Sequence, residues 1–162
     1  MNRIRRITLA TPLGLALLLA GAAGAVDEVN LSRGLTAEGA PLALHGYDPV
    51  AYFEDDAATL GSARHALVHD GATYYFASAG HREAFEKEPA RYLPAYGGYC
   101  AFGVSVGKKF DADPRYWKVE NGRLYLNLNA DIAREFAKDV PGTIQKAGAQ
   151  WAKIERTAVT DL

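Results

Sequence analysis

The stretch HALVHDGATYYFASAGHREAFEK, residues 65–87, decides the fold class of this chain. Its residues 65–69 alternate between two faces, and residues 73–77 are rich in the aromatic side chains that favour β-strands. Asp70-Gly71 separates the two runs, and Gly supplies the positive φ that a tight hairpin turn needs. The pattern therefore predicts a β-hairpin.

A helix is predicted directly after this hairpin. Ser78 is typical of a helix N-cap, and the helix should run to about Lys87, before Pro89. Phe85 should then face the core. The order of hairpin and helix indicates an α+β domain.

A second hairpin is predicted downstream, where residues 116–119 and 123–128 flank Asn121-Gly122. A helix capped by Asn129 or Asp131 should follow and end at Pro141-Gly142, and a C-terminal amphipathic helix should carry Ile144, Ala147, Trp151 and Ile154. Upstream, residues 47–53 are predicted to form a short strand or turn, and residues 90–96 a short helical or turn segment broken by Pro94. No internal repeat is evident. We therefore expect two β-hairpins packed against helices.

The N-terminus is typical of a secretory signal peptide. Arg3, Arg5 and Arg6 precede an apolar run over residues 9–20, and small residues place the cleavage site after Ala25. The run is too short to span a membrane comfortably. We expect a signal peptide over residues 1–25, an arm over 26–41 and one domain over 42–157. The protein should be exported to the periplasm, by the general or the twin-arginine route.

Charge and motifs restrict the class of function. Loss of Arg3, Arg5 and Arg6 reduces the 18 basic residues to 15 against 19 acidic ones, a net charge of about −4. Nucleic acid and, after cleavage, membrane surfaces are therefore unlikely partners. The sequence contains no hydrolase motif and no phosphate-binding loop, so no enzyme activity is assigned.

Cys100 is the single cysteine of the chain, although exported domains usually pair their cysteines. It cannot form an internal disulfide. It is therefore a buried inert thiol, a metal ligand, a redox group or the site of an intermolecular bridge.

Four ordered blocks resemble the exported YHS-domain proteins. They are GYDPVAYF at 46–53, YYFAS at 74–78 with Phe85, Pro89 with Tyr92, and YGGYCA at 96–101. The resemblance implies a treble-clef-like core and, in the wider family, heavy-metal binding through cysteines. Here Ala51, Ala77 and His81 stand where such cysteines often occur, so a structural zinc site is not expected. The exported subfamily keeps the Gly-Gly-Tyr-Cys block, and some relatives carry selenocysteine near it.

Candidate ligands follow from the thiol and the four histidines, since imidazole is a natural partner of a thiolate in copper sites. The candidate metal ligands are Cys100, His45 and His81; the candidate pocket-lining residues are Tyr47, Asp48, Tyr99, Gly97 and Gly98. His65 and His69 would lie about 13 Å apart along a strand and cannot share an ion.

Other polar residues have local interpretations. Asp48 is expected to close an Asx-type turn, and Asp111 and Asp113 to cap a loop, since the remaining ligands of a calcium loop are absent. Lys108 or Lys109 could lower the pKa of Cys100 only if the chain folds back.

Three functions remain open at this point. The first is a binding module that handles a soft metal ion such as Cu(I) through Cys100. The second is a thiol-redox protein whose Cys100 reacts with peroxide, a disulfide or the thiol of a partner protein. The third is a non-catalytic interaction domain with an incidental cysteine. The sequence sets no oligomeric state.

Overall fold

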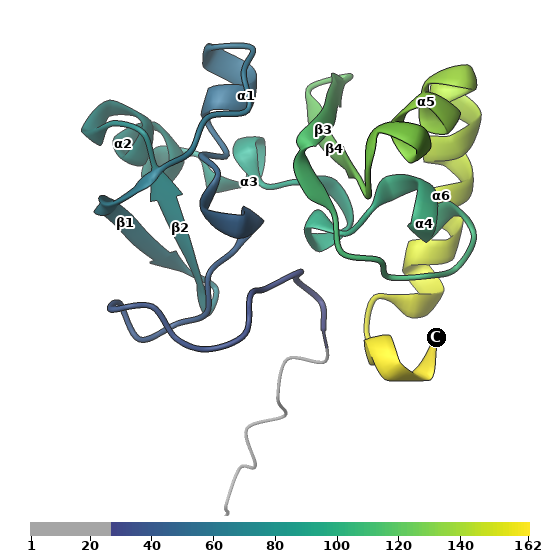
Figure 1. The fold of residues 1–162 in the computed structure, drawn as a ribbon, viewed down its shortest axis with the longest axis horizontal. Helices are drawn as coiled ribbons and strands as arrows, with labels where there is room; N and C mark the ends of the chain where they lie inside the picture. The colour runs from purple at the N-terminus through teal and green to yellow at the C-terminus, as the bar shows by residue number, and fades with distance from the viewer. Residues whose placement is uncertain (1–26) are drawn as a thin grey trace, which may run out of the picture.

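The computed structural model describes residues 27–162, so the predicted signal peptide and its cleavage site lie outside the described residues. Two antiparallel hairpins and the helices around them form the molecule, which confirms the α+β class (Figure 1). None of the described helices combines the length and apolar character that crossing a membrane requires.

The first half of the molecule is built around the predicted hairpin of β1 (Ser62–His69) and β2 (Ala72–Phe76). Its turn residues Asp70 and Gly71 both have positive φ, 47° and 77°, as a two-residue hairpin turn needs. Ser78 caps α2 (Ala79–Lys87), because its hydroxyl accepts a hydrogen bond from the main-chain N–H of His81. The remaining elements of this half are η1 (Leu44–Gly46), α1 (Ala51–Glu54) and α3 (Pro89–Tyr92).

The second half contains the same elements in the same order. These are η2 (Ala95–Gly98), α4 (Ala101–Ser105), β3 (Asp113–Glu120), β4 (Arg123–Asn127), α5 (Ala130–Lys138) and α6 (Val140–Ile154); η3 (Val159–Asp161) follows. Strands β3 and β4 and helix α5 each begin and end 51 residues after β1, β2 and α2, as the starts Ser62 and Asp113 illustrate. The two hairpins even share one irregularity, a register shift after the first strand residue.

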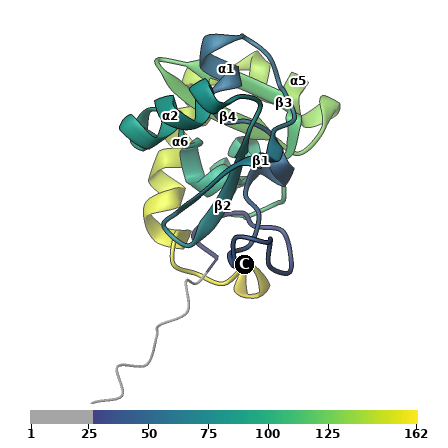
Figure 2. The same cartoon turned by 90° about the vertical axis from the view of Figure 1, so that its left-hand side faces the viewer.

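The chain is therefore an internal repeat, and our prediction that it has none was wrong. Figure 1 shows the first half on the left and the second on the right, and Figure 2 shows the first half in front of the second. The repeat escaped detection because the shared positions are few and scattered. Gly71, Tyr74 and Phe85 are matched by Gly122, Tyr125 and Phe136, but most other positions differ.

Each half is entered through three consecutive residues in the left-handed region. In the first half these are Leu44, His45 and Gly46, with φ of 51°, 50° and 82°. In the second they are Tyr96, Gly97 and Gly98, with φ of 56°, 60° and 84°. Residues other than glycine are uncommon in this region, although histidine adopts it more often than most, so the left-handed Leu44 and Tyr96 are the less usual members of the two triplets.

Three local predictions need correction. The segment predicted as a strand or turn at residues 47–53 leads through a turn into the short helix α1. Pro141-Gly142 does not end a helix but lies in the first turn of α6, where proline has no N–H bond to lose. The sequence analysis also missed α4, whose N-cap is Cys100 rather than one of the usual capping residues.

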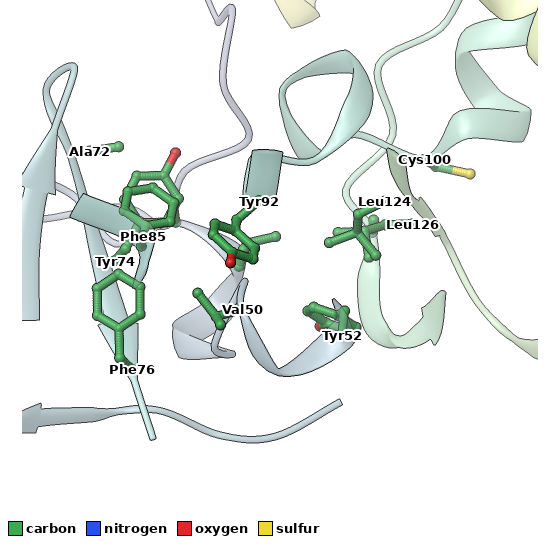
Figure 3. Close-up of a cluster of buried hydrophobic side chains, with 13 residues drawn as sticks. Val50, Tyr52, Ala72, Tyr74, Phe76, Phe85, Tyr92, Cys100, Leu124 and Leu126 are labelled. Atoms are coloured by element: carbon green, nitrogen blue, oxygen red, sulfur yellow. The ribbon is translucent and has the colours of Figure 1, made fainter. Parts of the chain in front are cut away.

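The main hydrophobic core joins the two halves. Side chains from both halves meet in it, with Phe76 of β2 and Phe85 of α2 from the first half and Leu124 and Leu126 of β4 from the second (Figure 3). All four are almost completely buried, and each large apolar side chain contributes about 1.5–3 kcal/mol when it leaves water. The halves are therefore one folding unit rather than two domains.

Lys109 links the two ends of the described chain. Its buried ammonium donates hydrogen bonds to the carbonyl oxygens of Asp27 at 2.8 Å, Glu155 at 2.7 Å and Thr157 at 2.8 Å. The carboxylate of Asp27 also accepts a bond of 2.9 Å from the main-chain N–H of Val159. One lysine thus holds the N-terminal arm against the end of α6.

Candidate functional site

Cys100 is completely buried at the start of α4. Its Sγ accepts a hydrogen bond of 3.3 Å from the main-chain N–H of Gly103. Burial raises the pKa of the thiol above its usual value, although the main-chain N–H groups of Gly103, Leu128 and Phe102 act in the opposite direction. Figure 3 shows the sulfur directed away from Leu124 and Leu126.

Asp48 occupies the same place in the first half. Its carboxylate accepts bonds of 2.8 Å from the main-chain N–H groups of Val50 and Ala77. The corresponding positions of the second half are Phe102 and Leu128, whose main-chain N–H groups act to lower the pKa of the Cys100 thiol. The main-chain N–H groups of the two residues also form corresponding hydrogen bonds. That of Asp48 donates to the carbonyl oxygen of Thr59, and that of Cys100 donates to the carbonyl oxygen of Phe110.

The carboxylate of Asp48 and the thiol of Cys100 thus each lie among main-chain N–H groups, although the hydrogen bond from Gly103 to Cys100 has no counterpart at Asp48. We call each a backbone cradle. The Asx-type turn predicted for Asp48 is confirmed, since Oδ1 bonds the N–H two residues ahead. The contact with Ala77 shows that this carboxylate also ties the turn to the end of β2.

His81 belongs to the Asp48 cradle. Its Nδ1 lies 2.6 Å from Asp48 Oδ2, and its Nε2 lies 3.7 Å from Asp55 Oδ2. The corresponding position of the second half is Ile132, so the Cys100 cradle has no imidazole there. The structure thus brings two of the candidate residues together, Asp48 and His81, in the half that does not contain the thiol.

His45 lies at the rim of an open polar hollow of about 410 Å³. The hollow is lined by His45, Tyr47, Asp111, Ala112, Asp113, Pro114, Arg115 and Leu128. His45 Nε2 lies 2.8 Å from Asp111 Oδ1, which also accepts a bond of 2.7 Å from Asn30. Burial works to raise the pKa of Asp111, but the hydrogen bonds from Asn30 and His45 prevail and hold it below its usual value.

Leu128 connects this hollow with Cys100. Its side chain lines the hollow and is 37% exposed, while its main-chain N–H points to the sulfur. Phe110, which accepts the main-chain bond of Cys100, directly precedes Asp111 and is 45% exposed. Cys100 therefore lies behind the wall of the hollow that His45 borders.

The remaining candidates have separate places. Tyr47 lines the His45 hollow, and Tyr99 lines a neighbouring one that also contains His45 and Asp111. Gly97 packs so closely on the carbonyl of Glu28 that no side chain fits there, and Gly98 packs near Asn30. Both glycines thus seat the N-terminal arm.

Neither the flanking lysine nor the strand histidines supply a partner to the thiol in the described contacts. Lys109 is committed to the carbonyl groups at the two chain ends, so the idea that it activates Cys100 is not supported. His69 lies against Asp70 and the edge of Phe85. Of the loop acids, Asp113 caps locally through Arg115, whereas Asp111 makes the long-range contact with His45.

Within residues 27–162 no three or more His, Cys, Asp and Glu side chains are arranged to hold a metal ion. An ion at Cys100 would therefore have two protein donors at most from the nearby hollow. A thiolate and an imidazole nonetheless match the donor types that soft ions select. Searches of protein-family models, curated proteins and solved structures found no match to this chain.

Proposed function

We propose that this chain is an exported YHS-type protein that binds a soft metal ion such as Cu(I), with Cys100 and His45 as donors. The observation that carries the proposal is the cradle of Cys100. The main-chain N–H groups of Gly103, Leu128 and Phe102 act to lower the pKa of the buried thiol, and they would stabilise the thiolate that a bound metal ion requires. A metal-bound cysteine is such an anion.

His45 is the histidine that we propose as the second donor, because it lines the hollow that also contains Leu128. Its backbone is left-handed, with φ of 50°, at the position where the second half has Gly97. The carboxylate of Asp111 lies 2.8 Å from Nε2 of His45 and orients the imidazole ring, as carboxylates do for histidines that bind metals. His81 is less suitable, since its ring is engaged by Asp48 in the other half.

The state of the thiol favours metal binding over redox chemistry. The reacting species in thiol redox chemistry is the thiolate, and burial raises the pKa of Cys100. A soft ion instead displaces the proton when it binds. Because Cys100 is completely buried, binding requires the half-exposed side chains of Leu128 and Phe110 to move aside.

One observation favours the interaction-domain alternative. Phe110 and Leu128 are apolar, exposed and adjacent to Cys100 in the backbone hydrogen-bond pattern. Exposed apolar side chains that gather at one place are typical of protein-docking surfaces. In that case a partner protein would cover the cysteine and no ion would bind.

The test is a competition titration of reduced protein, residues 26–162, with Cu(I) and a chromogenic chelator. We expect one ion per chain, no binding by Cys100→Ser and affinity reduced by about 10-fold or more in His45→Gln. His65→Gln is the matched control and should bind normally, since no contact ties His65 to this region. Binding that survives Cys100→Ser contradicts the proposal.

Two measurements separate the alternatives if Cu(I) does not bind. Loss of the free thiol on treatment with peroxide, at a rate equal in folded and urea-unfolded protein, supports the redox function. A thiol that reacts about 100-fold more slowly when folded supports the interaction domain.

A further inference from the structure

A second hollow, separate from Cys100, lies between β4, η2 and α6. It measures about 310 Å³, within the range of sites for small molecules. Its lining includes Tyr96, Arg123, Tyr125, Ile144, Gly148 and Trp151. In Figure 1, α6 runs along the outer side of the second half, beside α4 and α5.

Three aromatic side chains, Tyr96, Tyr125 and Trp151, line this hollow. The ring of Tyr96 lies 5.9 Å from that of Tyr125 and 5.9 Å from that of Trp151. The hydroxyl of Tyr96 donates to the carbonyl of Ile144 at 3.2 Å, which fixes the ring. Tyr96 also keeps its side chain despite a left-handed φ of 56°. The hollow thus offers flat, pre-ordered apolar surface.

Arg123 is the one charged residue in this lining. Within residues 27–162, its guanidinium takes part in no described ion pair or hydrogen bond, whereas Arg91, Arg115 and Arg134 each have a carboxylate partner. An adjoining hollow shares Tyr96, Arg123 and Trp151 with this one and also contains Glu28 and Glu155. Glu28 lies against Arg156, and Glu155 accepts a hydrogen bond from Trp151. The planar guanidinium group of Arg123 is therefore suited to bind a carboxylate through two hydrogen bonds.

The absence of a side chain at Gly148 leaves space in the hollow that a ligand could occupy. It lies inside α6, where glycine is less stable than alanine. A Cβ at this position would meet no atom within 4 Å, so packing does not require glycine. Ile144, Gly148 and Trp151 follow the i, i+4, i+7 spacing of one helix face. Glycine here widens the hollow at the cost of helix stability.

From these features we infer that the hollow binds a small carboxylate that carries an aromatic ring. The ring stacks against Tyr96 and Trp151, and the carboxylate pairs with Arg123. This site is independent of the proposed metal function, since none of its residues lines the His45 hollow.

Phenylacetate is a suitable probe, and 2-phenylethanol is its neutral counterpart. We expect phenylacetate to shift the ¹H–¹⁵N resonances of Arg123, Gly148 and the Trp151 indole, with a Kd of about 1 mM or tighter. The alcohol should bind about 10-fold more weakly. Absence of saturable shifts at these residues, or equal binding of both compounds, overturns the inference.

Variants assign the interactions. Arg123→Gln should reduce phenylacetate binding to the level of the alcohol. Lys153→Gln removes the same charge on α6, outside the lining of the hollow, and should leave binding unchanged. Gly148→Leu should abolish binding of both compounds. Gly148→Ala should weaken binding and raise Tm by about 2–4 °C. Unchanged binding in a folded Gly148→Leu protein contradicts the site.

Discussion

Replacement of Asp48 by alanine tests the cradle most directly. The carboxylate is fully buried and accepts three hydrogen bonds: 2.8 Å from Val50, 2.8 Å from Ala77 and 2.6 Å from the ring of His81. A bond to a charged group contributes about 1.5–3 kcal/mol, and water entering the vacated space replaces part of it. We therefore expect Asp48→Ala to lower the free energy of unfolding by about 3–5 kcal/mol.

This loss is a large fraction of the about 5–15 kcal/mol that stabilise a domain of this size. It corresponds to a decrease in Tm of about 10 °C. Urea denaturation followed by far-ultraviolet circular dichroism measures it. Asp55→Ala is the control, because its carboxylate is 49% exposed and lies 3.7 Å from His81; it should cost less than about 1 kcal/mol. Equal losses in the two variants refute the cradle as the source of stability.

Three further variants probe other features. Lys109→Met should cost about 2–4 kcal/mol, since three carbonyl groups lose a charged donor, and limited proteolysis should then cut residues 27–32 faster. Asn127→Leu should raise the free energy of unfolding, measured by urea denaturation, by about 1 kcal/mol, because the buried Oδ1 accepts no hydrogen bond from the described residues. The lowered pKa of Asp111 gives stability that is present above its unfolded pKa and is lost as the pH falls through the folded one. The stability difference between wild type and Asp111→Asn should therefore shrink between about pH 5 and pH 3, and a difference constant with pH argues against this role.

Local chemistry explains which parts of the fold were predictable. Both hairpins were recognised because Asp70-Gly71 and Asn121-Gly122 take the backbone angles of tight turns. Ser78 was recognised as a helix cap, and Asn129 proved to be the cap among two candidates. These signals depend on neighbouring residues, so one sequence contains them in full.

The candidate site depends on contacts that no local pattern encodes. His45 and Asp111 are 66 residues apart, and the same acid has an obvious alternative as a loop cap. The repeat was hidden for a related reason. Backbone donors, which any residue supplies, form the two cradles, so the side chains of Val50 and Phe102 can differ without changing them.

Because the two ends of the described chain lie together, the order of its segments along the chain could be changed by circular permutation. Asp27 bonds Val159, and Lys109 binds the backbone on both sides, so a short linker could close residues 27–162 into a ring. New ends could then open at Asn121-Gly122, where an added Cβ at Gly122 would meet no neighbouring atom. In the sequence of such a circular permutant, β4, α5 and α6 would precede the hairpin of β1 and β2. It should fold to the same structure, since the contacts that join the ends depend on proximity and not on where synthesis begins.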